Sequence, residues 1–269
     1  MNNYLKIYWY DIIFAIVLFI TIAGISGQLF FYLANFLHLD TALLTPINTV
    51  FNYLMLFLIF YFICLKPREQ KFRLSYNLKK FQLFPICLCL FIGQFLLSEF
   101  LTGLIPTQGP FFGYLHNLMT QALVGSLNKQ PVAVFISICI IAPIFEEIFF
   151  RGFILKGMLN NKVPPYKAII ISSIIFGGIH IFPWQVLAGI LAGIVLGISF
   201  YKTGSLAVST LLHFLNNLLG FYLYYKNGNF DSPEIGFSNY VYPIIGLIII
   251  IISGYFLNKI TKKYSWKYY

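Results

Sequence analysis

Two carboxylates and a guanidinium lie close together in a stretch of the chain that is otherwise apolar. Glu146, Glu147 and Arg151 fall within residues 145–151, and the preceding run 131–142 carries no charge. An ionisable side chain at bilayer depth costs at least about 2.5–3.5 kcal/mol, so these three need partners and a use. On a helix, Glu147 and Arg151 would stand one turn apart and could pair, whereas Glu146 would point about 100° further round the axis. The spacing predicts one neutralised carboxylate and one left for chemistry; a purely structural ion pair is the alternative.

Two more polar pairs occur in apolar segments further along the chain. Phe176 and His180 are four residues apart, and so are His213 and Asn217. A four-residue spacing places both members of a pair on one face of a helix. Histidines, glutamates, an arginine and an asparagine on three helices of one bundle predict a shared functional site rather than isolated buried polar groups.

The residue types in this set are suited to hydrolysis by an activated water. A carboxylate and an imidazole can together act as general base, and a second imidazole with an amide can donate hydrogen bonds to a developing oxyanion. These groups would make a peptide hydrolase without a covalent nucleophile. As an alternative, Glu146, His180 and His213 could hold Zn²⁺ with a water in the fourth position. The chain has no H-E-x-x-H and no G-x-S-x-G, so the zincin and serine-hydrolase signatures are missing.

The segments that carry these residues are expected to cross a membrane. The chain of 269 residues is 59% hydrophobic and only 10% charged, which is typical of polytopic membrane proteins. At about 20 apolar residues per spanning helix, eight segments qualify. They are roughly 11–36, 45–65, 83–105, 131–157, 166–182, 184–201, 205–225 and 240–258. We therefore predict an all-α polytopic membrane protein, a bundle of about eight transmembrane helices in a single membrane domain (1–269).

Positive charge is concentrated on alternate links between these segments. The net charge is +10. Lysines and arginines crowd the link 66–80 and the tail 259–267, whereas the links 37–44 and 182–184 have none. By the positive-inside rule, this distribution places both termini in the cytoplasm and favours an even number of spans. We interpret the basic residues as topology signals rather than as a surface for nucleic acid.

The length of the fourth helix decides whether the polar groups can meet. If that helix ended at Arg151, Glu146 would lie only about 7 Å from the membrane boundary and His180 about 20 Å from it, at 1.5 Å per residue. No site could form from groups at such different depths. We therefore predict a helix that continues to Lys156 or beyond, which would place Glu146 about 15 Å deep.

Other polar or small residues in the apolar segments have structural interpretations. In the sixth segment Gly189, Gly193 and Gly197 recur every fourth residue, so one smooth face would let a neighbouring helix approach closely. Glu99 is expected to reach the outer interface or to pair inside the bundle. His116 lies in an amphipathic link that is expected to form a short helix along the outer interface.

The ordered set of motifs resembles a known family. E-E-x-x-x-R, F-x-x-x-H and H-x-x-x-N occur in that order on successive apolar segments, and the turn 201–206 before the third motif fits the same pattern. The set resembles the CAAX-protease and bacteriocin-processing family, also called CPBP or Abi, of intramembrane endopeptidases. The resemblance covers roughly 130–220 as a catalytic core, and the N-terminal spans in 1–129 carry no part of it.

The resemblance implies a role for each motif residue. By this resemblance, Glu146 and His180 would activate the water. His213 and Asn217 would form the oxyanion site. Glu147 and Arg151 would support these four residues. The family is described both as glutamate-type and as metalloprotease. We favour the glutamate type, which needs no cofactor, and keep zinc on Glu146, His180 and His213 as the alternative.

The resemblance also implies the kind of substrate. Eukaryotic relatives cut after a prenylated cysteine. The composition of this chain, rich in Ile, Asn, Lys and Tyr, resembles that of proteins from AT-rich Gram-positive bacteria, which lack such substrates. Bacterial members are associated with peptide maturation, immunity and signalling. We expect an integral protein of the bacterial plasma membrane that acts on a peptide or a membrane-protein segment. A non-proteolytic immunity or regulatory protein is one alternative; a proton-coupled transporter is another, although the inverted repeats typical of transporters are not visible.

Overall fold

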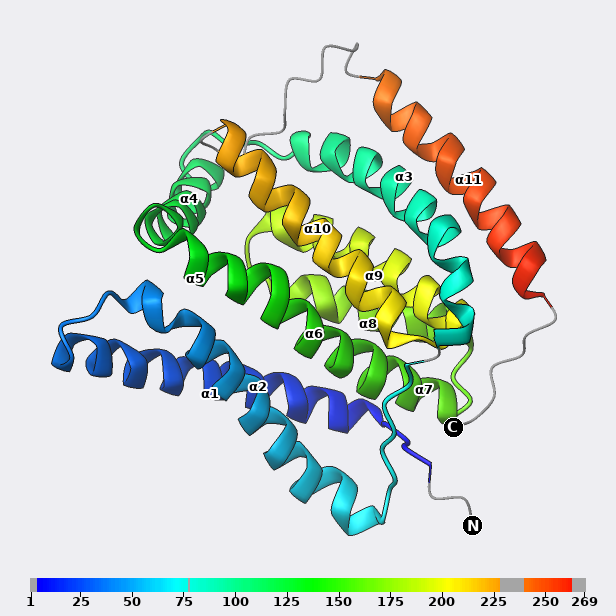
Figure 1. Ribbon diagram of the computed structural model, residues 1–269, viewed down its shortest axis with the longest axis horizontal. Helices are drawn as coiled ribbons and strands as arrows, with labels where there is room; N and C mark the ends of the chain where they lie inside the picture. The colour runs from blue at the N-terminus through cyan, green and yellow to red at the C-terminus, as the bar shows by residue number, and fades with distance from the viewer. Residues whose placement is uncertain (1–3, 77, 228–239, 263–269) are drawn as a thin grey trace. The chain divides into compact units, whose positions relative to one another are not determined.

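The computed structural model of the protein describes residues 4–76, 78–227 and 240–262. These residues are built from helices (Figure 1). In chain order the helices are α1 (Trp9–Phe36), α2 (Thr45–Phe60), α3 (Phe84–Gly103), α4 (Phe112–Lys129), α5 (Pro131–Phe135), α6 (Ala142–Glu147), α7 (Lys156–Asn160), α8 (Pro165–Gly178), α9 (Pro183–Thr203), α10 (Leu206–Asn227) and α11 (Val241–Thr261).

The prediction of an all-α polytopic membrane protein is confirmed. Each of the predicted apolar segments is helical, and within the described residues 7 helical stretches are long and apolar enough to cross a membrane. The exception is α8, whose 14 residues are about 21 Å long at 1.5 Å per residue, short of a bilayer's hydrocarbon core. The cytoplasmic placement of both termini stays a prediction.

The described residues fall into two compact units. The first unit contains 4–73 and 123–163, and the second contains 74–122 and 164–262. Helix α4 begins in the second unit and ends in the first. The predicted limits of the catalytic core stay a prediction.

The first unit is built around one long helix, Pro131–Asn160, which confirms that the fourth helix continues past Arg151. The stretches Ile136–Ile141 and Ile148–Leu155 have π-helical hydrogen bonding, and α6 lies between them. Pro143 accounts for the first stretch, because a proline ring inside a helix clashes with the carbonyl four residues earlier, here that of Cys139. π-Turns within α-helices are frequent at functional sites.

The C-terminal end of this helix is held by side chains that donate to backbone carbonyls. Lys156 Nζ donates to the carbonyl oxygen of Arg73 at 2.8 Å, and Asn160 Nδ2 donates to that of Leu5 at 2.8 Å. Leu5 and Arg73 both lie outside helices, so their carbonyls have no helical partner, and these two donors supply one.

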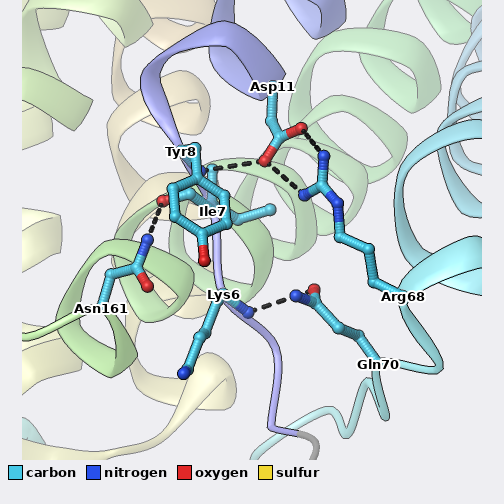
Figure 2. A network of polar contacts seen from close by, with 7 residues as sticks. All are labelled: Lys6, Ile7, Tyr8, Asp11, Arg68, Gln70 and Asn161. Atoms are coloured by element: carbon cyan, nitrogen blue, oxygen red, sulfur yellow. Dashed lines mark hydrogen bonds and ion pairs between the residues drawn. The ribbon is translucent and has the colours of Figure 1, made fainter.

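The start of α1 is tied to the end of the α2 stretch through an ion pair. Figure 2 shows Asp11 accepting two hydrogen bonds from Arg68, at 2.8 Å each, and one from the backbone N–H of Tyr8 at 2.9 Å. Asn161 Nδ2 donates to the carbonyl of Ile7 at 2.8 Å in the same network. A fork-shaped guanidinium–carboxylate pair adds geometric specificity to its charge attraction, so α1 and α2 close as a hairpin at this end.

The second unit packs α3, α9, α10 and α11 around an apolar core. Its buried members come from all four helices: Cys87, Leu90, Phe91, Val195, Leu196, Val208, Leu212 and Leu257. α3 and α11 lie side by side (Figure 1) and cross at two glycines. A Cβ on Gly93 would come within 2.7 Å of the carbonyl oxygen of Gly246, and a Cβ on Gly246 within 2.7 Å of that of Gly93. Only glycine permits this backbone approach.

The predicted glycine face of the sixth segment is confirmed at two positions, and the partner helix is α8. A Cβ on Gly189 would lie 2.9 Å from Cα of Gly177, and one on Gly193 would lie 3.0 Å from Cα of Ser173. Small residues on both sides therefore bring the backbones of α8 and α9 together, as is typical of membrane helices.

The turn before α10 is held by residues of the 74–76 segment. α9 ends at Thr203 and is capped by Gly204, whose φ of 63° is the left-handed conformation that glycine adopts readily. The N–H of Leu206 donates to the carbonyl of Ser75 at 2.8 Å, and Ser75 Oγ donates to the carbonyl of Gly204. The turn thereby sets where α10 begins.

Two adjacent glycines of α8 provide a test of the α8–α9 packing. A Cβ on Gly177 would lie 2.5 Å from the carbonyl oxygen of Val186 and 2.7 Å from the amide nitrogen of Ile190, and backbone atoms cannot move aside. We expect Gly177→Ala to lower the free energy of unfolding by at least about 1–3 kcal/mol, as overpacking does. Gly178→Ala is the matched control, because nothing lies within 4 Å of its Cβ position. Thermal unfolding in detergent measures both; equal melting temperatures for the two variants would contradict the packing.

Candidate active site

The predicted ion pair of the first motif is present in the first unit. Arg151 Nη1 lies 2.9 Å from Glu147 Oε1, one helical turn away. The side chains are 1% and 0% exposed, so the pair is shielded from solvent. Between such groups the attraction is strong but so is the desolvation penalty, and the pair persists because each charge neutralises the other. This geometry confirms the pairing; the supporting role of the pair in catalysis stays a prediction.

Glu146 points to a different partner, which the sequence did not reveal. The hydroxyl of Tyr53 in α2 donates to Glu146 Oε1 at 3.0 Å, and both side chains are buried. Glu146 lies in α6, the short α-helical stretch between the two π-turns. The two neighbouring carboxylates of the motif are therefore held by different groups, as their angular separation on the helix predicts.

In the second unit, Phe176 lies against both motif histidines. Its ring meets that of His180 edge to face, with centroids 5.4 Å apart and planes at 69°. It meets the ring of His213 in the same way, at 5.4 Å and 84°. Edge-to-face contacts of this kind are favourable and fix ring orientation. The phenylalanine of F-x-x-x-H thus brings the second and third motifs together.

His180 is not on the helix with Phe176, and here the sequence interpretation was wrong. α8 ends at Gly178, and His180 lies in the following turn. Its Nδ1 nevertheless lies 2.9 Å from the carbonyl oxygen of Phe176. A carbonyl oxygen can only accept, so Nδ1 carries the proton and, in the neutral ring, Nε2 is the basic nitrogen. The side chain of His180 therefore caps the end of α8 at the carbonyl of Phe176, and the two residues do not lie on one helix face.

The turn after His180 has an unusual backbone conformation. Ile181 has a φ of 67°, and the N–H of Phe182 donates to the carbonyl of His180 at 2.7 Å. A hydrogen bond between residues i and i+2, with a positive φ at the residue between them, defines a strained γ-turn. A β-branched residue such as isoleucine is rare at that central position. Strain of this kind persists only where the surroundings impose it, and it occurs often at functional sites.

His213 and Asn217 are one turn apart on α10, as predicted. His213 is 4% exposed, and Asn217 Oδ1 accepts a hydrogen bond from Asn216 Nδ2 at 3.2 Å. An acceptor interaction at Oδ1 orients the amide so that its NH₂ group points the other way. The spacing and orientation allow a ring N–H and an amide N–H to serve as two donors, although their role as an oxyanion site stays a prediction.

The zinc alternative is compatible with the ring orientation of His180 but has no ligand cluster to support it. A histidine that donates its second N–H to a backbone carbonyl is as suitable for a metal as for proton transfer. Among the residues that the structure describes, however, no group of three or more His, Cys, Asp or Glu side chains is gathered as metal ligands.

His116 is found in a contact that joins two helices. The link predicted to be an amphipathic helix is α4, and the ring of His116 meets that of Trp184 edge to face at 5.2 Å. Trp184 Nε1 donates to the carbonyl of Ile105 at 3.3 Å. These contacts join α4 to the start of α9 within the second unit, and the placement of α4 at the outer interface stays a prediction.

The buried ion pair makes a prediction about stability. Arg151→Ala leaves the carboxylate of Glu147 buried without its cation, so we expect the free energy of unfolding to fall by about 3–5 kcal/mol. Replacing both charges, as Glu147→Gln with Arg151→Met, should recover most of that loss because no uncompensated charge remains. The melting temperatures of the purified variants in detergent provide the measurement. A normal melting curve for Arg151→Ala would contradict the burial of the pair.

The match to a known protein family falls on the segment that carries the motifs. Residues 128–219 match the family model described as type II CAAX prenyl endopeptidase Rce1-like. One curated relative, the UPF0177 protein YxdF of Lactococcus lactis subsp. lactis (strain IL1403), is 32% identical over 82 residues, which make up 30% of this chain and 44% of the relative. The match thus spans less than half the length of that relative. No solved structure matches the chain.

All three motifs lie within the matched residues, and the matched residues begin just before the long helix of the first unit. The resemblance indicated by the ordered motifs is therefore confirmed for this segment: residues 128–219 of this membrane protein are similar to the type II CAAX prenyl endopeptidase Rce1-like family.

Proposed function

We propose that this protein is an intramembrane endopeptidase that hydrolyses a peptide bond in a peptide or membrane-associated protein. The observation that carries the proposal is the coincidence of two independent features. The segment that matches the CAAX endopeptidase family contains every motif residue, and the polar side chains of those motifs are held by specific contacts in an apolar protein.

Glu146 and His180 activate the attacking water in this proposal. The carboxylate of Glu146 and the unprotonated Nε2 of His180 are both acceptors, so they can orient a water and take one of its protons. The resulting hydroxide adds to the carbonyl carbon of the substrate. The ring orientation of His180 supports this role, because Nδ1 faces the carbonyl of Phe176 and Nε2 is left for the water.

His213 and Asn217 stabilise the oxyanion that forms in this step. As the hydroxide adds, negative charge develops on the substrate's carbonyl oxygen, and pre-oriented N–H donors in a water-poor site lower the energy of that charge. The proton taken from water then passes to the amine nitrogen as the C–N bond breaks, so the products are a carboxylic acid and an amine. Glu147 and Arg151 support the helix on which Glu146 is carried.

The substrate in this proposal is a peptide or a membrane-protein segment in the bacterial plasma membrane. Among the described residues, the seven helical stretches that are long and apolar enough to cross a membrane support a substrate that reaches the site from the bilayer or its surface. The Lactococcus relative supports a bacterial setting. Peptide maturation, immunity or signalling would each supply such a substrate.

Replacement of Glu146 tests the proposal most directly. Glu146→Gln keeps the volume of the side chain and removes the base, so hydrolysis should fall by at least about 10²-fold, the usual scale for loss of a general base. The measurement compares the peptides present in membranes of cells that express the wild type or the variant. A peptide that is cut in the first and accumulates uncut in the second identifies the activity and its cleavage site.

Glu99→Gln is the matched control for this comparison, because Glu99 is a glutamate of the α3 span outside the motifs. It should leave the peptide pattern unchanged at an equal protein level. Identical patterns for wild type and Glu146→Gln would contradict the endopeptidase and favour a protein that only binds its peptide.

The glutamate-type mechanism also predicts independence from metal. In this mechanism the histidines transfer protons and donate hydrogen bonds, so the purified protein should retain cleavage of that peptide after long incubation with a strong chelator. Elemental analysis should find no stoichiometric metal. About one zinc per chain, lost together with activity and restored by added zinc, would instead assign Glu146, His180 and His213 as ligands.

A further inference from the structure

We propose that Tyr53 is a positioning residue for the carboxylate of Glu146, so that α2, which lies outside the motif segment, contributes directly to the catalytic geometry. This inference rests on the proposed function for its kinetic consequence, while the contact itself is independent of it. The residues concerned belong to one compact unit.

The contact is a buried hydrogen bond between side chains far apart in sequence. Tyr53 Oη donates to Glu146 Oε1 at 3.0 Å across 93 residues of chain. Tyr53 is 5% and Glu146 8% exposed, so bulk water competes little for either group. Hydrogen bonds to a charged acceptor are shorter and stronger than those between neutral groups, and in a low-dielectric setting they hold their partner firmly.

The hydroxyl of Tyr53 can hold the carboxylate only because its own ring is fixed. That ring stacks on Phe145, with centroids 5.3 Å apart and planes at 10°, and Phe145 is the residue directly before Glu146. On another side the ring meets Phe19 of α1 at 5.6 Å. Phe57, one turn further along α2, lies 6.3 Å away. Aromatic contacts on several sides leave the ring little freedom.

A row of aromatic contacts aligns α2 with the long helix. Phe57 lies 6.0 Å from Phe145, 6.4 Å from Phe149 and 5.5 Å from Phe153, ring centroid to centroid. These partners recur every four residues along the helix that carries Glu146. The register between the two helices is therefore determined by several rings, and the position of the Tyr53 hydroxyl follows from that register.

The position of the carboxylate matters because general-base catalysis depends on geometry. A base must lie within hydrogen-bond reach of the proton that it takes, and misplacement by about 1 Å can lower a rate by about 10²-fold. Glu146 lies in the short α-helical stretch between two π-turns. In those two turns the backbone departs from regular α-helical geometry. A donor from a neighbouring helix fixes the end of the side chain where the helix itself does not.

The first experiment measures the contact without any substrate. Melting temperatures are compared for wild type, Tyr53→Phe, Glu146→Met and the double variant, in detergent. Phenylalanine keeps the ring contacts and removes the hydroxyl, and methionine keeps the length and removes the acceptor. If the hydrogen bond is present, the double variant loses less than the sum of the single losses. Strictly additive losses would overturn the inference.

The second experiment measures the kinetic role in proteoliposomes, with a fluorescence-quenched copy of the peptide that accumulates uncut in the membranes of Glu146→Gln cells. We expect Tyr53→Phe to lower kcat by about 10- to 10²-fold with KM little changed, because the base is misplaced while substrate binding is not. Tyr61→Phe, an exposed tyrosine two turns further along the same helical stretch, should retain the wild-type rate.

A third variant tests whether Tyr53 acts through Glu146. Glu146→Asp withdraws the carboxylate by one methylene, so adding Tyr53→Phe to it should cause no further loss of rate. A wild-type kcat for Tyr53→Phe, or an equal further loss in the Glu146→Asp background, would overturn the positioning role. Cleavage that is unaffected in Glu146→Gln would overturn the proposed function instead, and the melting comparison would still decide whether the contact exists.

Discussion

The cost of placing charge in an apolar interior is the constraint on which this structure depends. Glu147 and Arg151 are almost completely inaccessible and lie 2.9 Å apart on consecutive turns of one helix. Neither could be retained alone, since an uncompensated charge there would be destabilising by several kcal/mol. Glu147 and Arg151 pair within their own helix, and the neighbouring Glu146 accepts a hydrogen bond from Tyr53 of another helix.

The helix that carries these groups is irregular in a way that has a physical cause. Pro143 interrupts the regular hydrogen bonding, and π-turns flank the short stretch that contains Glu146 and Glu147. An irregular helix loses local rigidity, and here neighbouring elements supply it. Rings of α2 pack along the long helix, and hydrogen bonds from its last turn to the segments 4–8 and 69–76 hold its end. Packing and backbone capping therefore replace part of the rigidity that a regular helix would have.

The second unit positions its polar groups differently, through small residues and one aromatic ring. The glycine contacts between α8 and α9 bring the end of α8 close to Gly189, whose Cβ position lies 3.6 Å from Nδ1 of His180. The ring of Phe176 contacts both histidine rings edge to face, and its carbonyl oxygen also contacts Nδ1 of His180. A strained turn at Ile181 reverses the chain directly after His180. The side chain of Ile181 is itself exposed, so the turn is held by the hydrogen bonds of its neighbours, from Phe182 N–H to the carbonyl of His180 and from His180 Nδ1 to the carbonyl of Phe176.

Residue spacing by itself determined a large part of this protein. Runs of apolar residues predict the helices, and the four-residue spacings predict the Glu147–Arg151 pair and the placement of His213 with Asn217, because helix geometry is local and repeats with the sequence. The glycine repeat likewise predicts close helix packing, although not which helix is the partner. Pro143 was a visible signal for the irregular turn near the motif, but its effect on hydrogen bonding depends on how the helix is packed.

Only the tertiary structure decided the rest. His180 leaves the helix and caps it, because the close approach of α9 and the turn at Ile181 override the periodicity that a longer α8 would continue. The contact between Tyr53 and Glu146 joins residues 93 positions apart, and no local pattern distinguishes Tyr53 from the other tyrosines of an aromatic-rich chain. Contacts of this kind depend on the register between helices, which is set by the packing of many side chains at once and not by spacing along one segment.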